Sequence, residues 1–115
     1  MSSRRPLRAN ERELIRTMLS EKPNQTELTS NLDGCLVEDM QDGGMGSVRF
    51  VGHSQRQRVF GHAVAEAEYT DDDGVLVSIA INTDDGGDLY ELDFWKVDFS
   101  PLRRYPTPSD LRMKS

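Results

Sequence analysis

Two hydrophobic periodicities divide the chain. An apolar stripe with helical spacing comes first, formed by Leu14, Ile15, Met18 and Leu19. Asn10 precedes the stripe and Glu13 stands three positions later, a spacing typical of a capped helix start, and Pro23 ends the segment. The pattern predicts a helix that begins at Asn10 and leaves room for a short second helix around Leu28 and Leu32.

From residue 34 onward the period changes to two, which is typical of strands. Runs rich in Val, Ile and aromatic residues alternate with turns of Gly and Asp, and they cover residues 35–40, 47–52, 58–70, 75–83 and 89–99. Because short connections favour antiparallel neighbours, we expect an α+β fold. In it, an N-terminal helix packs on a twisted antiparallel meander sheet of about five strands.

The same pattern predicts how the chain is organised. We expect a flexible arm over residues 1–9, a single α+β domain over 10–102 and a loose tail over 103–115. The prolines and the low apolar content of the last segment favour the tail.

Turn chemistry predicts the register of the hairpins. A three-residue loop that ends in a left-handed Gly74 pairs Asp71 with Val75, and it puts small and apolar residues of both strands on one face. Two loops fit the next hairpin. A two-residue loop over 85–86 pairs Ile79 with Leu92, whereas a four-residue loop over 85–88 keeps the same faces with another register.

The segment DGGMGS, residues 42–47, combines three glycines with one methionine. A phosphate-binding loop would need a lysine and a following helix, and strand residues follow Ser47 instead. We therefore predict a hairpin turn with positive φ at some of its glycines. The turn chemistry does not explain Met45, which either tucks under a neighbour or contacts a partner, so it is a candidate interface residue.

The predicted register gathers a set of carboxylates on the polar face of the sheet: Glu66, Glu68, Glu91 and Asp93. The favoured interpretation is a solvated face answered by arginines such as Arg49, Arg103 or Arg104. A calcium- or magnesium-like site, a carboxylate pair for acid–base catalysis and a surface for a basic partner stay open as alternatives. No metal ligand is assigned.

Trp95 lies in the apolar run FWKVDFSPL, so a place at the edge of the core is the plain interpretation. An exposed Trp95 would instead mark an interface hot spot, and for this reason it is the second candidate interface residue.

Charge and composition narrow the function classes. The net charge is −6, and residues 33–98 carry fifteen acidic and four basic side chains. Such a body repels nucleic acid, and no apolar run is long enough for a membrane span. Cys35 is the single cysteine, which excludes an internal disulfide and favours a cytoplasmic protein. No cofactor is expected, and the oligomeric state stays open.

Three segments together resemble a known family: RPLRANERELIRTML, DGGMGSVRF and DLYELDFWKVDFSPL. The chain is similar to small bacterial proteins that share the domain of unknown function DUF6984, over roughly Arg5 to Leu102. The resemblance implies a compact bacterial domain and transfers no catalytic residue. It draws attention to Asp42, Met45 and Asp98 as well as Trp95 without giving them roles.

These observations favour a non-enzymatic binding domain whose acidic body suits a basic protein partner. A toxin-neutralising, immunity-type role is one version of it, based on small size and acidity. The alternative is a small carboxylate-based enzyme or a divalent-metal-dependent ligand-binding domain. The enzyme needs the four carboxylates to converge in a concave pocket, whereas the interaction domain needs exposed apolar side chains.

Overall fold

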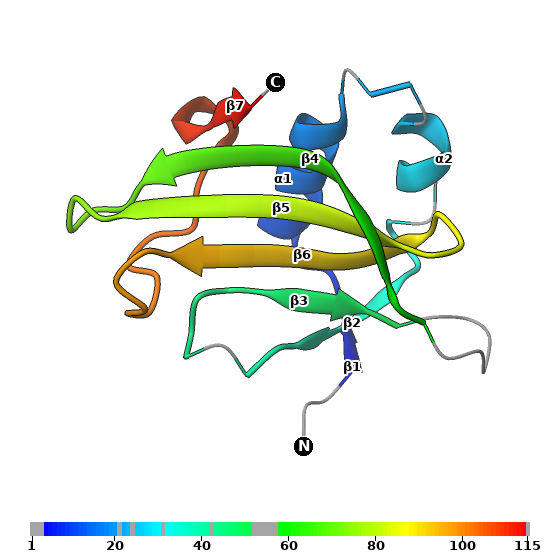
Figure 1. Cartoon of the computed structure of the whole chain (residues 1–115), viewed down its shortest axis with the longest axis horizontal. Coiled ribbons are helices and arrows are strands. Elements are labelled where there is room, and N and C mark those ends of the chain that lie inside the picture. Colours follow the sequence, from blue (N-terminus) through cyan, green and yellow to red (C-terminus); the bar gives the residue numbers. More distant parts are fainter. Residues whose placement is uncertain are drawn as a thin grey trace.

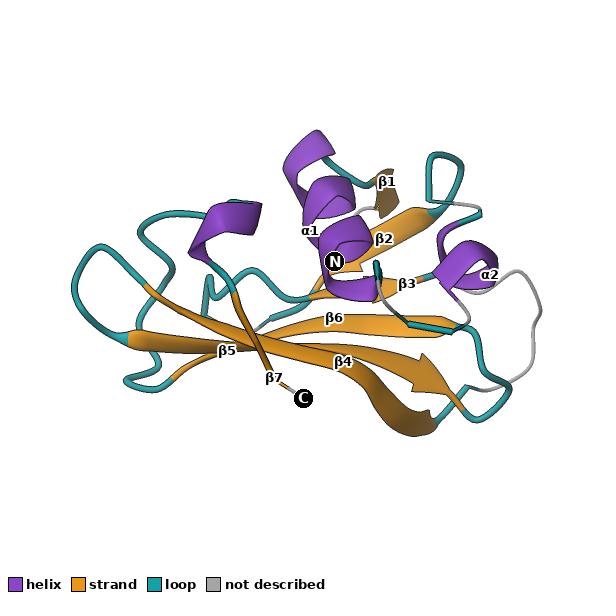
Figure 2. Ribbon diagram, turned by 90° about the horizontal axis from the view of Figure 1, so that it is seen from above, coloured by secondary structure: helices purple, strands orange, loops and turns teal. Residues whose placement is uncertain are grey.

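An antiparallel sheet with helix α1 on one face forms the fold (Figure 1, Figure 2). The computed structural model describes residues 4–20, 22–23, 25–30, 32–41, 43–51 and 58–114. The helices are α1 (Ala9–Leu19) and α2 (Gln25–Thr29), and a short 3-10 turn covers Pro108–Asp110. The strands are β1 (Arg4–Pro6), β2 (Leu36–Asp39), β3 (Val48–Phe50), β4 (Phe60–Thr70), β5 (Leu76–Asp84), β6 (Leu89–Lys96) and β7 (Arg112–Lys114). None of the described helices is long and apolar enough to cross a membrane.

The strand order is β1-β2-β3-β6-β5-β4-β7, and neighbouring strands are antiparallel. The α+β class and the antiparallel sheet are confirmed, but the meander is wrong because β3 pairs with β6, as Val48 does with Leu92. The connection between β3 and β4, residues 51–59, explains the error. A segment of that length reaches about 30 Å, and the three strand spacings that it must cross amount to about 14 Å.

The prediction of about five strands is too low, since the sheet has seven. The two further strands come from the segments expected to be an arm and a tail: β1 pairs with β2, and β7 pairs with β4. Both are short edge strands rich in basic residues, and their side chains are mostly exposed. A period-two apolar pattern identifies strands with a buried face, so edge strands of this kind leave no such pattern.

The N-cap of helix α1 lies two residues before the predicted one. Its N-cap is Arg8, and the Glu11 carboxylate accepts the Arg8 backbone N–H at 2.7 Å, so the prediction for Asn10 and Glu13 is wrong. Glu11 is buried, and the Arg5 guanidinium donates to both of its carboxylate oxygens at 2.8 and 2.9 Å. An arginine of the β1 edge strand thus neutralises the buried capping acid.

The apolar stripe of α1 packs on the inner face of the sheet as predicted. The stripe and the inner residues of β4 and β5 belong to one buried cluster: Leu14, Ile15, Met18, Leu19, Ala65, Ala67, Tyr69, Val77, Ile79 and Ile81. Helix α1 contacts β4 most, where two alanines let the helix approach closely.

The first hairpin has the predicted register. Tyr69 pairs with Val77, and Gly74 has a φ of 79°. In the second hairpin the register of the four-residue alternative is correct, because Ile79 pairs with Phe94 rather than with Leu92. The register shifts after Asn82, and the Asp84 N–H donates to the Asp88 carbonyl, so the turn itself has three residues. The faces are the same in both cases, so the carboxylates stay on the outer face, which is the face opposite α1.

The glycine-rich segment is a turn with positive φ at each of its glycines: 75° at Gly43, 84° at Gly44 and 100° at Gly46. This confirms the hairpin interpretation. The turn packs on the segment after β6, because the Leu102 N–H donates to the Gly44 carbonyl at 3.1 Å. A Cβ added at Gly46 would lie 3.1 Å from Leu102 Cδ1, so close packing restricts this position as well as backbone geometry.

Leu14→Ala should lower the free energy of unfolding by about 2–5 kcal/mol, since it removes a buried side chain and leaves a cavity under the sheet. Urea denaturation measures the loss. Glu13→Ala changes an exposed neighbour on the same helix and should change stability by less than about 0.5 kcal/mol. Equal effects of the two substitutions would contradict the packing of α1.

Gly46→Ala and Gly74→Ala separate backbone strain from crowding. Both glycines have positive φ, but nothing lies within 4 Å of a Cβ added at Gly74. Each substitution should cost about 1 kcal/mol of strain, and Gly46→Ala should cost more because of Leu102. Thermal melts of the two variants make the comparison, and a less stable Gly74→Ala protein would argue against crowding at Gly46.

Candidate functional site

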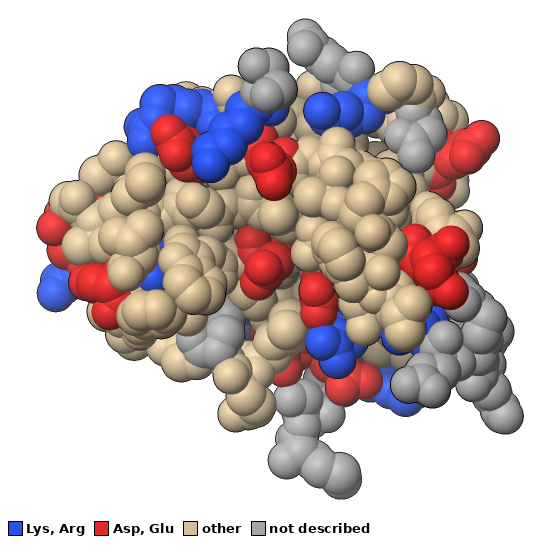
Figure 3. Space-filling view, in the orientation of Figure 1, with Lys and Arg blue, Asp and Glu red and all other residues tan. Residues whose placement is uncertain are grey.

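The outer face of the sheet carries the predicted carboxylates in neighbouring rows. Two rows cross β4, β5 and β6: Glu66, Ala80 and Asp93 form one, and Glu68, Ser78 and Trp95 form the next. Glu91 pairs with Asn82 further along. Figure 3 shows this face, with acidic side chains as separate spots across its middle.

Two of the carboxylates have basic partners on adjacent strands. The Arg49 guanidinium of β3 lies 2.7 Å from Glu91 Oε2. At the opposite edge of the sheet, on the same face, Arg112 Nε and Lys114 Nζ of β7 lie 3.5 and 3.9 Å from the Glu68 carboxylate. Arg49 is one of the arginines named from the sequence, whereas the basic residues of β7 were missed because that segment was taken for a loose tail.

Asp93 and Glu66 occupy the row between these pairs. Ser47 Oγ donates to Asp93 Oδ1 at 3.2 Å, which turns this carboxylate toward β3. Within the described part of the chain, Glu66 forms neither a hydrogen bond nor an ion pair. Glu66 is therefore the member of the carboxylate set without a polar partner among the described residues.

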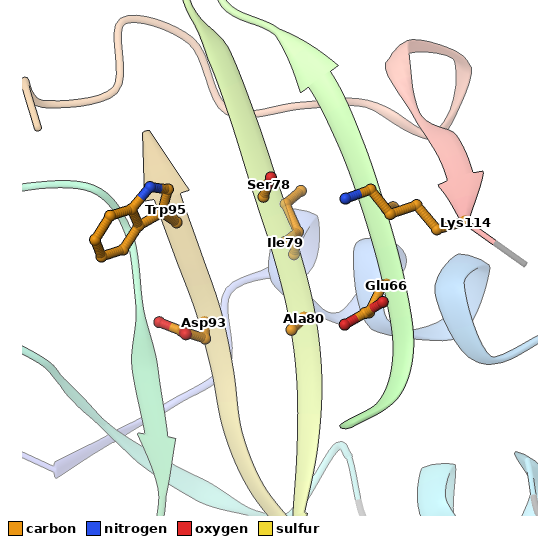
Figure 4. Close-up of a pocket in the computed structure, with 8 residues that line it drawn as sticks. Glu66, Ser78, Ile79, Ala80, Asp93, Trp95 and Lys114 are labelled. Atoms are coloured by element: carbon orange, nitrogen blue, oxygen red, sulfur yellow. The ribbon is translucent and has the colours of Figure 1, made fainter. Parts of the chain in front are cut away.

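A shallow hollow lies over this row (Figure 4). Its floor is formed by the small side chains of Ser78 and Ala80 on β5, and its sides by Glu66, Asp93, Trp95 and Lys114. Figure 4 shows the Lys114 side chain reaching across β4 toward Ser78. The hollow exists because β5 presents small residues between strands that present large ones.

The carboxylates do not converge as an enzyme or a metal site would require. Only Glu66 and Asp93 line the hollow, and β5 separates them, which sets their backbones about 10 Å apart. Over the described residues, no group of three or more His, Cys, Asp or Glu side chains could hold a metal ion.

Trp95 is exposed at the end of β6, so its placement at the core edge is wrong. Half of its surface, 50%, is open to solvent, and its ring meets the Phe99 ring edge-on at 4.9 Å. Phe99 is 61% exposed, and Val97 between them is exposed as well. These three residues, Trp95, Val97 and Phe99, form an exposed patch that we call the aromatic patch.

The backbone holds Phe99 in an unfavourable conformation. Its φ is 64°, and it is the one described residue other than glycine with a positive φ. The Phe99 N–H donates to the Lys96 carbonyl at 2.9 Å, and Asp98 accepts the Ser100 hydroxyl at 2.7 Å, which with the Ser100 N–H lowers the pKa of Asp98. A bulky residue in this region is strained and is often found at functional sites.

Met45 is buried, so it is no longer a candidate interface residue. It belongs to the core cluster, and its sulfur accepts the Lys96 backbone N–H at 3.3 Å. Of the two possibilities that the sequence left for Met45, it tucks under its neighbours. Asp42, which the family resemblance also pointed to, lies outside the described residues.

A buried ion cluster on the inner face was missed from the sequence. Lys96 is 0% exposed, and its ammonium lies 2.9 Å from Asp71 Oδ2, 2.7 Å from Asp73 Oδ2 and 3.1 Å from the Pro101 carbonyl oxygen. The alternation of β6 contained the signal, because Lys96 continues the inward series of Leu92 and Phe94.

Hydrogen bonding keeps this cluster charged. Burial by itself raises the pKa of Asp71, but the Arg103 N–H, the Lys96 ammonium and the Asp72 N–H outweigh it and lower the pKa to about 2. Burial likewise lowers the pKa of Lys96, but the carboxylates of Asp71 and Asp73 reverse this and raise it. A protonated lysine is no nucleophile, so the cluster is structural.

Arg103 and Arg104 contact acids of the turn after β4 and of the segment before β7 rather than the carboxylate face. Arg104 lies 2.8 Å from Asp72 and 2.6 Å from Asp110, and Arg103 lies 3.4 Å from Asp73. The interpretation that Arg103 or Arg104 partners the outer carboxylates is therefore wrong, whereas Arg49 does so.

Asp71 should make the fold sensitive to acid. Its pKa is about 2 in the folded protein against an ordinary 3.8, so its stabilisation is present above pH 3.8 and is lost as the pH falls toward 2. The free energy of unfolding should fall over this range, and Asp71→Asn should flatten the fall at the cost of lower stability at pH 7. Urea denaturation at several pH values tests this, and an unchanged slope in the variant would contradict it.

Comparisons with known proteins give one family. The model of the domain of unknown function DUF6984 matches residues 4–106, which include the outer face of β4 to β6 and the ion cluster. Neither a curated protein nor a solved structure matches the chain. The match covers most of the chain and agrees with the three sequence segments that resemble this family, so the chain belongs to the DUF6984 family.

Proposed function

We propose that the protein is a non-enzymatic interaction domain that binds a basic protein partner on the outer face of its sheet. The observation that carries the proposal is the aromatic patch of Trp95, Val97 and Phe99 beside the hollow that contains Glu66. Exposed aromatic side chains on a rigid strand end are typical of interface anchors.

The strain at Phe99 supports this assignment. A phenylalanine with a φ of 64° and 61% exposure gains little burial in return for its strained backbone. Its ring instead packs edge-on against the Trp95 ring. This contact restricts both side chains before a partner binds. Side chains that are ordered in advance lose less entropy on binding.

Charge gives the chemical class of the partner. The net charge is −6, and Glu66 lines the hollow with no answering base in the described residues. A lysine or arginine side chain from a partner would meet the Glu66 carboxylate on one side of the hollow and the Trp95 ring on the other. Complementary charge of this kind speeds encounter and selects the partner.

Two finer points belong to the same proposal. A cytoplasmic location fits the single cysteine, Cys35, and an immunity-type role fits the small size and acidity. A bacterial toxin with a basic surface is then one partner of the required chemistry.

Trp95 is the single tryptophan of the chain, so its fluorescence reports on this face directly. A peptide of alternating Lys and Val residues should shift its emission saturably, whereas a peptide of alternating Glu and Val should not. Phe99→Ala should weaken binding of the basic peptide about tenfold, the loss typical of an interface anchor.

Leu36→Ala is the matched control, because Leu36 is 42% exposed but lies on β2, away from the aromatic patch and from β4. It should leave the affinity unchanged. Equal binding of both peptides, or equal losses in Phe99→Ala and Leu36→Ala, would overturn the proposal.

A further inference from the structure

The edge of β4 is held by a very short strand. Strand β7 pairs Arg112 with Glu68, Met113 with Ala67 and Lys114 with Glu66, while β4 is eleven residues long. Figure 1 shows β7 beside β4 at the margin of the sheet. No described strand pairs with this edge of β4 before Glu66, so the backbone donors and acceptors of that stretch have no strand partner on this side among the described residues.

The contacts that hold β7 are weak. Its three residues are exposed, and both of its ion pairs go to Glu68 at 3.5 and 3.9 Å. Exposed pairs of this length contribute little to stability. Lys114 stands opposite Glu66 and forms no ion pair with it.

The segment before β7 has its own anchor. Arg104 Nη1 lies 2.6 Å from Asp110 Oδ2, and the same carboxylate oxygen accepts the Thr107 N–H at 2.8 Å. The Arg104 carbonyl accepts the Tyr69 hydroxyl from the core. These bonds end before β7 begins, so β7 can leave β4 while the rest of the chain keeps its place.

The chain's own segment shows which chemistry fits the edge. Arg112 and Lys114 face the outer carboxylates two positions apart, and the Lys114 side chain lines the hollow that also contains Glu66 and Trp95 (Figure 4). The Lys114 ammonium, which β7 brings to this edge, therefore already lies in the hollow where the proposed partner would place a cation.

We infer that the edge of β4 is a strand-addition site for an extended basic segment of the partner, and that β7 is its internal substitute. The inference rests on the proposed function and adds the form of the ligand: a strand with two basic residues two positions apart. Backbone pairing supplies affinity and the two cations supply selectivity, as in other cases of strand addition. The partner displaces β7, and its longer strand pairs with the open part of β4.

A capped peptide with the sequence Leu-Arg-Met-Lys, which copies residues 111–114, is the probe. Met113→Pro removes a strand N–H and disfavours pairing of β7, and Met113→Ala is the matched control that keeps the N–H. In isothermal titration calorimetry, the Pro variant should bind the peptide about tenfold or more tightly than the wild type and the Ala variant, because the tethered strand no longer competes. A peptide with Glu in both basic positions should not bind.

A second variant without proline tests whether the effect of Met113→Pro comes only from a misfolded chain. The double substitution Arg112→Gln and Lys114→Gln weakens β7 through its side chains alone and should also tighten peptide binding. Adding Glu68→Gln to the Pro variant should remove part of the gain, since it deletes the acceptor of both basic side chains.

The outcomes separate the two proposals. Equal affinity of the wild type and both weakened variants overturns the strand-addition site, while the interaction domain stands if Trp95 emission still responds to the basic peptide. If neither the Leu-Arg-Met-Lys peptide nor the Lys-Val peptide binds to the wild type or to any variant, both proposals are overturned. A wild-type dimer in sedimentation that Met113→Pro dissociates would show that a second copy occupies the edge, and it would overturn the basic partner segment.

Discussion

The buried pairing of Lys96 with Asp71 and Asp73 is the interaction on which the rest of the structure depends. It ties three segments that are far apart in sequence: the turn after β4, the end of β6 and the stretch that follows Pro101. A charge in the core is tolerated only when its partners are in place, so these segments must meet in one arrangement. The same residue fixes the aromatic patch, because its carbonyl accepts the Phe99 N–H while its ammonium binds the Pro101 carbonyl.

The two faces of the sheet carry separate tasks as a result. The inner face forms the core and the ion cluster, whose hydrogen bonds keep Lys96 and its carboxylates charged. On the outer face, β5 contributes the small residues Ser78 and Ala80 between larger neighbours. A hollow beside the paired rings of Trp95 and Phe99 follows from this alternation.

The place of β3 decides how the outer carboxylates differ from one another. Because β3 lies against β6, Arg49 forms an ion pair with Glu91, and Ser47 donates a hydrogen bond to Asp93. Glu68 forms ion pairs with β7 at the opposite edge of the sheet, and Glu66 forms no ion pair among the described residues. In a simple meander, β3 would lie next to β4 instead, and Arg49 would meet another set of acids. The non-sequential pairing therefore decides which of the outer carboxylates have partners on β3.

The sequence by itself determined what depends on residues close together in the chain: the apolar stripe of α1, the positive φ of the turn glycines, the first hairpin and the common face of the four carboxylates. Each follows from a period or a turn that a short segment specifies. Tertiary structure alone decided the pairing of β3 with β6, the edge strands, the exposure of Trp95, the burial of Met45 and the ionic partners of Lys96. These features depend on contacts between segments distant in the chain, such as Ser47 with Phe94, and Asp71 with Lys96. A local pattern cannot specify them, because the free energy that selects them arises only when the distant segments meet.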